Sequence, residues 1–150
     1  MSQVQILSIG KTTAEYLPLI SHWLKMIKLD LSERVLIAPK GLREEQLKVL
    51  EAKMLKQHIT RPGIFIAMDA CGIHMASEKF AQMIGKNIDS ATPMTFVIGG
   101  AYGIDKTLLG EADLRLSLSQ MTMPHLLAKL VLVEQIYRAE TIMRGHPYHK

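Results

Sequence analysis

Short hydrophobic runs alternate with longer amphipathic segments along the chain. The runs are rich in β-branched and aliphatic residues with little polar interruption, a pattern typical of strands buried on both faces of a sheet. Strands are expected at residues 4–9, 34–38, 63–68, 95–98 and 114–118. The segments between them have the length and periodicity of helices. This alternation predicts an α/β fold in which helices sandwich a parallel sheet.

Helical spacing of apolar residues defines the intervening segments. It predicts helices over residues 16–29, 43–59, 78–86 and 124–143, with one further short helix between the last two strands. Ser77 is expected to cap the third of these helices, with Phe80, Met83 and Ile84 turned inward. The charged face of the second helix, which includes Glu51, is expected to be solvated.

The last predicted helix is apolar around most of its circumference. It begins at Pro124, a residue that favours the first turn of a helix. Its apolar positions are Leu126, Leu127, Leu130, Val131, Leu132, Val133, Ile136 and Tyr137. One face of a sheet cannot cover so much apolar surface, so we expect a second subunit to pack on this helix.

The composition is that of one compact domain. Of the 150 residues, 48% are hydrophobic, so the chain can bury a core, and we expect a single domain over residues 1–150. No apolar run approaches the roughly 18 residues that a membrane span needs, and the chain opens into a strand instead of a signal peptide. The single cysteine, Cys71, cannot form an internal disulfide. We expect Cys71 in the core of a cytoplasmic protein.

The charge leaves the choice of partner open. A formal net charge of +4 makes a polyanion such as nucleic acid a plausible partner without establishing one. Lys40 and Arg43, at the turn before the second helix, are candidate RNA contacts. The histidines near the end of the chain, His146 and His149, lack a third ligand at suitable spacing, so no metal site is expected.

Two loops that follow strands carry the candidate chemistry. In open α/β sheets ligands bind outside the carboxyl ends of the strands, where the glycine loop 99–103 and the loop 119–125 would lie. The glycine loop matches neither the dinucleotide fingerprint nor the P-loop, so a phosphate cradle is not expected. The composition instead favours a neutral adenosine-like group held by main-chain atoms and capped by Leu118, Met121 and Met123.

Several motifs in the right order resemble one known family. The stretches 96–103, 117–125, 134–139 and 147–150 are similar to the ribosomal large-subunit pseudouridine N3-methyltransferases. These enzymes are small members of the SPOUT, or trefoil-knot, methyltransferases. The resemblance covers the whole chain and is strongest in its last third. It implies a deep trefoil knot in the C-terminal part and a homodimer whose active site is completed across the interface.

The resemblance also implies an activity. The expected reaction is transfer of a methyl group from S-adenosylmethionine to N3 of a pseudouridine in 23S rRNA, with the assembled 70S ribosome as the substrate. The cofactor would be bound by Met68, Gly99, Gly100, Leu118, Ser119, Gln120, Met121, Thr122 and Met123. On the residues alone, these positions could equally be ordinary strand ends and tight turns.

Four residues are candidates for catalysis: His125, Arg138, Tyr148 and His149. Taken alone, His125 fits a structural or capping role, Arg138 an ordinary ion pair with Glu134, and the tail a frayed end. The resemblance implies that the tail folds back over the cleft and that Tyr148 stacks on a base. Arg138 would favour the anion of the target ring, and His125, His149 or an ordered water would remove its proton.

Two departures from the family pattern concern RNA positioning. Leu126 replaces a common glutamine, and Lys129 stands where arginine is usual, which keeps the charge but loses the bidentate fork. Two other functions stay open. One is a non-enzymatic, ribosome-associated protein that binds adenosine, and the other is a knotted methyltransferase that acts on tRNA.

Overall fold

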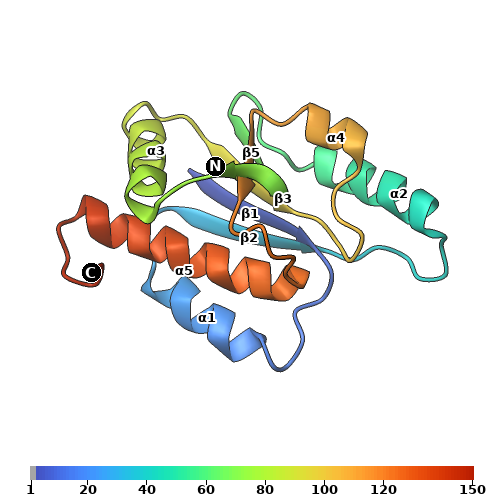
Figure 1. The fold of residues 1–150 in the computed structure, drawn as a ribbon, viewed down its shortest axis with the longest axis horizontal. Coiled ribbons are helices and arrows are strands. Elements are labelled where there is room, and N and C mark those ends of the chain that lie inside the picture. The colour runs from blue at the N-terminus through green and yellow to red at the C-terminus, as the bar shows by residue number, and fades with distance from the viewer. Residues whose placement is uncertain (1–2) are drawn as a thin grey trace.

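The fold is built on a parallel sheet (Figure 1). A computed structural model describes residues 3–150. The strands are β1 (Val4–Ile9), β2 (Leu31–Leu36), β3 (Ile64–His74), β4 (Met94–Ile98) and β5 (Leu114–Ser117). They pair in the order β2-β1-β4-β3-β5, and each neighbouring pair is parallel. The predicted α/β class with a parallel sheet is confirmed.

Helices cover both faces of the sheet. They are α1 (Leu17–Met26), α2 (Glu44–Lys56), α3 (Ser77–Asp89), α4 (Lys106–Gly110) and α5 (His125–Met143). Helices α1, α3 and α5 lie on one face, and α2 and α4 lie on the other (Figure 1). No helix within residues 3–150 is both long enough and apolar enough to cross a membrane.

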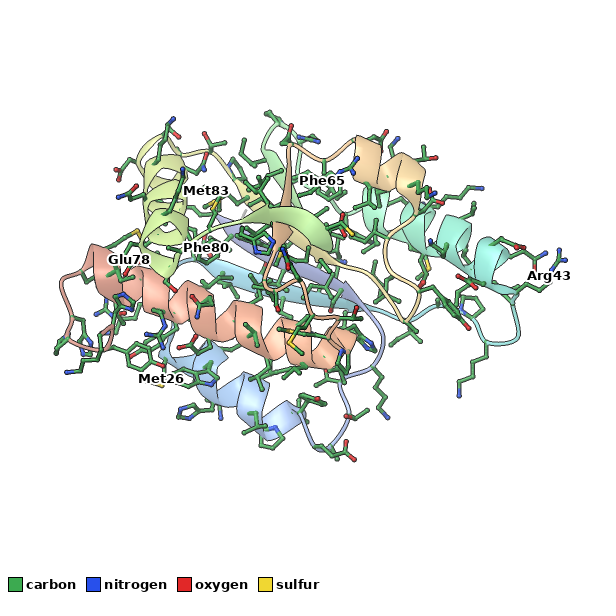
Figure 2. The ribbon with its side chains drawn as sticks, viewed as in Figure 1. Met26, Arg43, Phe65, Glu78, Phe80 and Met83 are labelled. Atoms are coloured by element: carbon green, nitrogen blue, oxygen red, sulfur yellow. The ribbon has the colours of Figure 1, made fainter. Side chains whose placement is uncertain are left out.

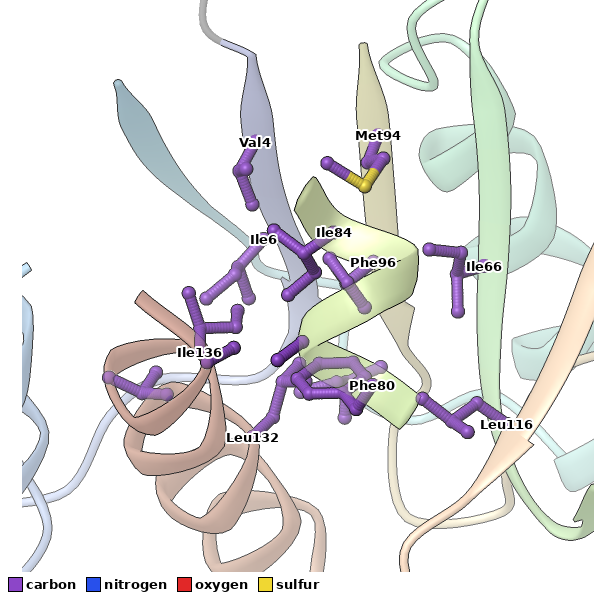
Figure 3. Packing of buried hydrophobic residues seen from close by; sticks show 14 of the residues in the cluster. Val4, Ile6, Ile66, Phe80, Ile84, Met94, Phe96, Leu116, Leu132 and Ile136 are labelled. Atoms are coloured by element: carbon purple, nitrogen blue, oxygen red, sulfur yellow. The ribbon is translucent and has the colours of Figure 1, made fainter. Parts of the chain in front are cut away.

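Successive residues of the central strands feed two separate cores. Phe96 is fully buried and meets Phe80 of α3 edge to face, with ring centroids 5.9 Å apart (Figure 3). Its neighbour Val97 points to the other face, where it packs in a second cluster with Leu55 of α2 and Leu108 of α4. Because side chains alternate along a strand, a buried strand must be apolar at every position, and this produces the continuous runs seen in the sequence.

Strand β3 extends well beyond its expected end at residue 68. Its pairing with β5 is interrupted between Met68 and Ile73 and then resumes as far as His74. Within the interruption, a side chain on Gly72 would come within 2.5 Å of the Arg115 carbonyl oxygen. Asp69 and Gly72 within this bulge hid the continuation of the strand. The placement of Cys71 in the core was also wrong, because the thiol is exposed on this segment.

Helix α3 begins differently from the expectation. Ala76 occupies the N-cap position, and no side chain caps the helix. Ser77 instead donates its hydroxyl hydrogen to Gln135 Oε1 of α5 at 2.7 Å, so the predicted cap is wrong. Phe80 and Ile84 are buried as expected, and Met83 packs at the edge of the same cluster.

Helix α5 is largely covered within the chain. It packs between α1 and α3, and Leu132, Val133 and Ile136 are completely buried. The apolar circumference of α5 therefore does not by itself require a second subunit. The homodimer, like the trefoil knot, rests on the family resemblance.

The crossing of the chain after β4 positions the candidate site. From β4 the chain passes through α4 and adds β5 to the far side of β3, so that β3 lies between β4 and β5. The carboxyl ends of these three parallel strands consequently meet at one edge of the sheet. Met68, Ile98 and Leu118, which are distant in sequence, come together there.

Candidate functional site

A cleft of about 680 Å³ opens at the carboxyl ends of β3, β4 and β5. The predicted cofactor residues that line it are Met68, Gly99, Gly100, Leu118, Ser119, Met121, Thr122 and Met123. Gln120 is exposed and is not among the lining residues. Ile104 and Ala128 also line the cleft, although their sequence context gave no sign of it. The cleft is therefore lined mainly by apolar side chains and by the backbone of two loops, with Asp69, Ser119 and Thr122 among its polar residues.

The glycine loop forms the tightest part of the wall. Gly103 has a φ of +80°, and its N–H donates to the Gly100 carbonyl at 3.0 Å, which folds the loop back on itself. A Cβ on Gly99 would lie 2.7 Å from the Gly103 carbonyl carbon and 2.9 Å from Ile104 Cγ1. Since backbone atoms cannot swing away as a side chain can, Gly99 has to be glycine for this loop to close.

A buried carboxylate lies behind the glycine loop. Glu51 of α2 is only 3% exposed, against the expectation of a solvated helix face, and burial raises the pKa of its carboxyl group. A Cβ on Gly100 would meet Glu51 Oε2 at 2.5 Å, so the carboxylate packs directly on the loop. Glu51 Oε1 finds no hydrogen-bond partner within residues 3–150. Glu51 lies one helical turn before Leu55, which is fully buried, so the two side chains share one face of α2. This spacing is the only sequence signal for the burial of Glu51.

The second loop is anchored at its base and open at its tip. The Ser117 hydroxyl lies 3.0 Å from the carbonyl oxygens of both Ala70 and Ser119, and Ser119 Oγ accepts from the Met121 N–H. Met121 is nevertheless 79% exposed. The loop thus holds a flexible apolar side chain at the mouth of the cleft, where it can cover a bound group.

His125 joins the cleft to the start of α5. Pro124 takes the N-cap position, so His125 is the first residue of the helix and does not cap it. Burial, and then the nearby Lys129 cation, lower the pKa of His125, and the ring is neutral at pH 7. Its Nε2 packs against Gly10 and is buried without a hydrogen-bond partner in the described chain.

Lys129 is engaged inside the fold. Its side chain is 1% exposed, and Nζ lies 2.6 Å from Glu33 Oε2 and donates to Ser8 Oγ at 3.2 Å. These contacts tie α5 to β1 and β2. Lys129, which stands where the resemblance led us to expect arginine, therefore takes part in an internal ion pair and does not lie on the protein surface.

The C-terminal tail folds back onto α5. Tyr148 Oη donates to Glu134 Oε1 at 2.7 Å, and the same oxygen accepts from Arg138 Nη2 at 2.7 Å and from Nε at 3.2 Å. The Arg138 guanidinium stacks 4.8 Å from the centroid of the Tyr148 ring, which also packs on Trp23 and Tyr137. The predicted Glu134–Arg138 pair is confirmed, and the tail is fixed instead of frayed.

His149 completes this cluster. Its Nδ1 lies 3.1 Å from Arg138 Nη1, and its Nε2 lies 2.8 Å from Glu78 Oε1 on α3. We refer to Glu78, Glu134, Arg138, Tyr148 and His149 as the tail cluster. The sequence interpretation gave Glu78 no functional role. Nothing in the sequence around the start of α3 indicates that the C-terminal tail folds back to contact this residue.

The tail cluster is remote from the cleft of its own chain. Arg138 follows His125 by 138 − 125 = 13 residues on one helix, which at 1.5 Å per residue separates them by about 20 Å. Arg138, Tyr148 and His149 do not line the cleft. The expectation that the tail covers the cleft is therefore wrong within one chain.

Residues 3–150 contain no group of three or more His, Cys, Asp or Glu side chains arranged to hold a metal ion.

The candidate chemistry rests on two separate sets of residues. One is the mainly apolar cleft, which also contains the neutral imidazole of His125. The other is a guanidinium fixed by a carboxylate beside two aromatic rings.

Comparison with known proteins covers nearly the whole chain. Residues 2–149 match a family described as predicted SPOUT methyltransferases. The chain is 36% identical over 160 aligned positions to ribosomal RNA large subunit methyltransferase H of Carboxydothermus hydrogenoformans, with 99% of each chain covered. It is 35% identical to the protein of the same name from Acetivibrio thermocellus, again with 99% coverage of both.

A more distant solved structure has a similar fold. This is the SpoU methyltransferase AviRb from Streptomyces viridochromogenes in complex with the cofactor AdoMet, with a TM-score of 0.51 and 11% identity. The match covers 93% of the present chain and 59% of the AviRb chain. At this identity the comparison concerns the arrangement of the backbone alone.

Proposed function

Because the chain belongs to the SPOUT methyltransferases, we propose that it transfers a methyl group from S-adenosylmethionine to N3 of a pseudouridine in 23S rRNA. The full-length relatives carry the name of large-subunit rRNA methyltransferases. The observation that carries the proposal is the cleft built by three strand ends, which is lined by eight of the nine predicted cofactor residues. Residues 1–150 then act as one catalytic domain in the cytoplasm, with the assembled 70S ribosome as substrate.

The cleft fits this cofactor in the chemistry of its walls. Gly99 and Gly100 let the loop pack closely on Gly103 and Glu51, which a Cβ would prevent. Met68 and Leu118 would supply apolar contacts for an adenine ring. The cofactor would supply a methyl group already activated by the sulfonium charge. The protein therefore has to orient the target nitrogen, exclude water and manage one proton.

The active site is proposed to be composite. The tail cluster lies about 20 Å along α5 from the start of the helix at the cleft. In the homodimer that the family resemblance implies, the cluster of one subunit would face the cleft of the other. In that arrangement Tyr148 stacks on the target base, and Arg138 stabilises the anion formed when the imide nitrogen loses its proton. Burial, and then the acceptor Glu134, raise the pKa of Tyr148, so its hydroxyl stays protonated. His125, His149 or an ordered water removes the proton.

The proposal is tested by methyl transfer from labelled S-adenosylmethionine to assembled ribosomes, separate subunits and tRNA, with the modified nucleotide identified by mass spectrometry. Label in a pseudouridine of large-subunit rRNA, dependent on assembled ribosomes, is the expected result. Label in tRNA would show that tRNA, and not rRNA, is the substrate. Binding of the cofactor without transfer to any RNA would favour the alternative that the protein binds adenosine and is not an enzyme.

Replacing Gly99 by alanine is expected to weaken S-adenosylmethionine binding at least tenfold. The new Cβ would lie 2.7 Å from backbone of Gly103, and overpacking of this kind costs about 1–3 kcal/mol, which is enough to displace the loop. Isothermal titration calorimetry measures the change. Gly110→Ala is the matched control, because a Cβ there meets nothing within 4 Å. Equal affinity of both variants for S-adenosylmethionine would show that the glycine loop is not part of the cofactor site.

A further inference from the structure

Both ring nitrogens of His149 are engaged. Nε2 lies 2.8 Å from a carboxylate oxygen of Glu78, and Nδ1 lies 3.1 Å from Nη1 of Arg138. The His149 side chain is 22% exposed, so the ring itself is largely enclosed by its neighbours. Figure 2 shows Glu78 at the end of α3 that faces α5, the helix that carries Arg138. His149 therefore bridges two helices through its two nitrogens.

The chemistry of the partners determines where the proton lies. A guanidinium nitrogen has hydrogens to donate and no lone pair to offer, so Nδ1 must present its lone pair to Arg138. An ionised carboxylate only accepts, so Nε2 must carry the hydrogen that points to Glu78. The hydrogen bond from His149 lowers the pKa of the Glu78 carboxyl group, which keeps it ionised. The Glu78 contact places a hydrogen on Nε2, and the Arg138 contact leaves Nδ1 without one, so the two contacts together define the neutral Nε2–H tautomer.

We propose that Glu78 is a positioning residue of the active site, which holds His149 in its Nε2–H tautomer so that the Nδ1 lone pair anchors Arg138. This role rests on the proposed function, because Arg138 matters only where a target base is bound. Glu78 acts through His149 and touches neither cofactor nor substrate.

The bridge leaves Arg138 with a defined set of remaining donors. Of the five N–H groups of a guanidinium, one on Nε and one on Nη2 go to Glu134, and one on Nη1 goes to His149. The two others, one on each terminal nitrogen, remain available to a further acceptor. Because the face of the group is stacked on Tyr148, its plane is fixed as well. The guanidinium is thus oriented from both sides before any substrate arrives.

The same geometry excludes His149 as the general base while the bridge is intact. Its only lone pair is used by Arg138, and a second proton on Nδ1 would face the guanidinium cation. Proton removal then falls to His125, whose ring is neutral and lines the cleft, or to an ordered water.

A different explanation for Glu78 is its position in the first turn of α3, where any carboxylate favours the helix N-terminus. Glu44 offers a matched control, because it occupies the first turn of α2, is exposed and takes no part in the tail cluster. Glu78 itself is 61% exposed, so its replacement leaves no buried gap. The variants Glu78→Ala, Glu78→Gln and Glu44→Ala therefore separate positioning from helix stabilisation.

The tautomer is read from long-range ¹H–¹⁵N NMR spectra of the histidine rings, with His149 assigned by its loss in His149→Gln. At pH 8 the wild-type ring is expected in the Nε2–H form. Glu78→Ala should shift the ring towards mixed tautomers, whereas Glu78→Gln, whose amide oxygen still accepts, should retain the wild-type pattern. A wild-type ring with Nδ1–H, or an unchanged Glu78→Ala spectrum, overturns the proposal.

Turnover provides a second readout. Glu78→Ala should lower kcat on ribosomes on the order of tenfold, with an unchanged KM for S-adenosylmethionine, and Glu78→Gln should recover most of it. Glu44→Ala should match the wild type. Equal losses in Glu78→Ala and Glu44→Ala would reassign Glu78 to helix stability. If the wild-type protein transfers no methyl group, the proposed function is wrong. The NMR spectra would still show which tautomer His149 adopts.

Discussion

Arg138→Ala is expected to lower the turnover of methyl transfer by 10²- to 10³-fold, on the order of the loss of one donor to a developing oxyanion. The guanidinium is held by Glu134, His149 and the Tyr148 ring, which makes it a fixed cation with little reorganisation to undergo during the reaction. Because the residue does not line the cofactor cleft, the affinity for S-adenosylmethionine should stay within about twofold of wild type.

The measurement is single-turnover transfer to ribosomes at saturating cofactor, with cofactor affinity measured separately by calorimetry. Arg138→Lys keeps the charge but loses the fork, so its rate should fall between those of Arg138→Ala and wild type. Arg34→Ala, which removes an exposed arginine from β2, serves as the control. If Arg138→Ala lost cofactor affinity and turnover equally, Arg138 would have no role in the chemical step.

Glu33→Ala is expected to reduce the free energy of unfolding by about 3 kcal/mol. The substitution leaves the Lys129 ammonium, which is 1% exposed, without the carboxylate 2.6 Å away, and a buried uncompensated charge is costly. We place the effect at the lower end of the range for broken buried pairs because the Glu33 side chain is 28% exposed. Urea denaturation followed by circular dichroism measures the change.

Two further variants test the cause of this loss. Glu33→Ala combined with Lys129→Met removes both charges and should recover most of the stability, since an apolar side chain of similar length suits the site. Glu111→Ala breaks an exposed ion pair with Lys56 and should cost less than about 1 kcal/mol. A double variant as unstable as Glu33→Ala would show that the buried charge is not responsible.

Periodicity predicted β1, β4 and β5 closely because these strands are largely buried, whereas β2 begins at Leu31, three residues before its expected start at residue 34. The continuous run from Met94 to Ile98 and the loops at its carboxyl end follow directly from that burial. Periodicity could not show that β5 lies beside β3, with β4 on the other side of β3, and this order is what places Met68 next to Leu118. For that placement, the motifs of the last third had to be compared with a known family.

Polar residues account for the main errors. Glu51 and Lys129 carry charges that normally lie in solvent, and their burial depends on tertiary partners that a one-dimensional pattern does not contain. Cys71 is apolar by type but lies on an exposed bulge. The resemblance implied that Arg138, Tyr148 and His149 lie near the target base. Their distance from the cleft of the same chain follows only from the length of α5.

The insertion of β4 between β1 and β3 has a consequence for folding kinetics. Val4 pairs with Met94, so 94 − 4 = 90 residues separate the two partners, whereas β1 and β2 are close in sequence. Loop closure over such a distance makes a high contact order and a slow search. During synthesis, one edge of β1 stays unpaired until β4 has emerged, and in that interval the nascent chain exposes an apolar strand edge to aggregation.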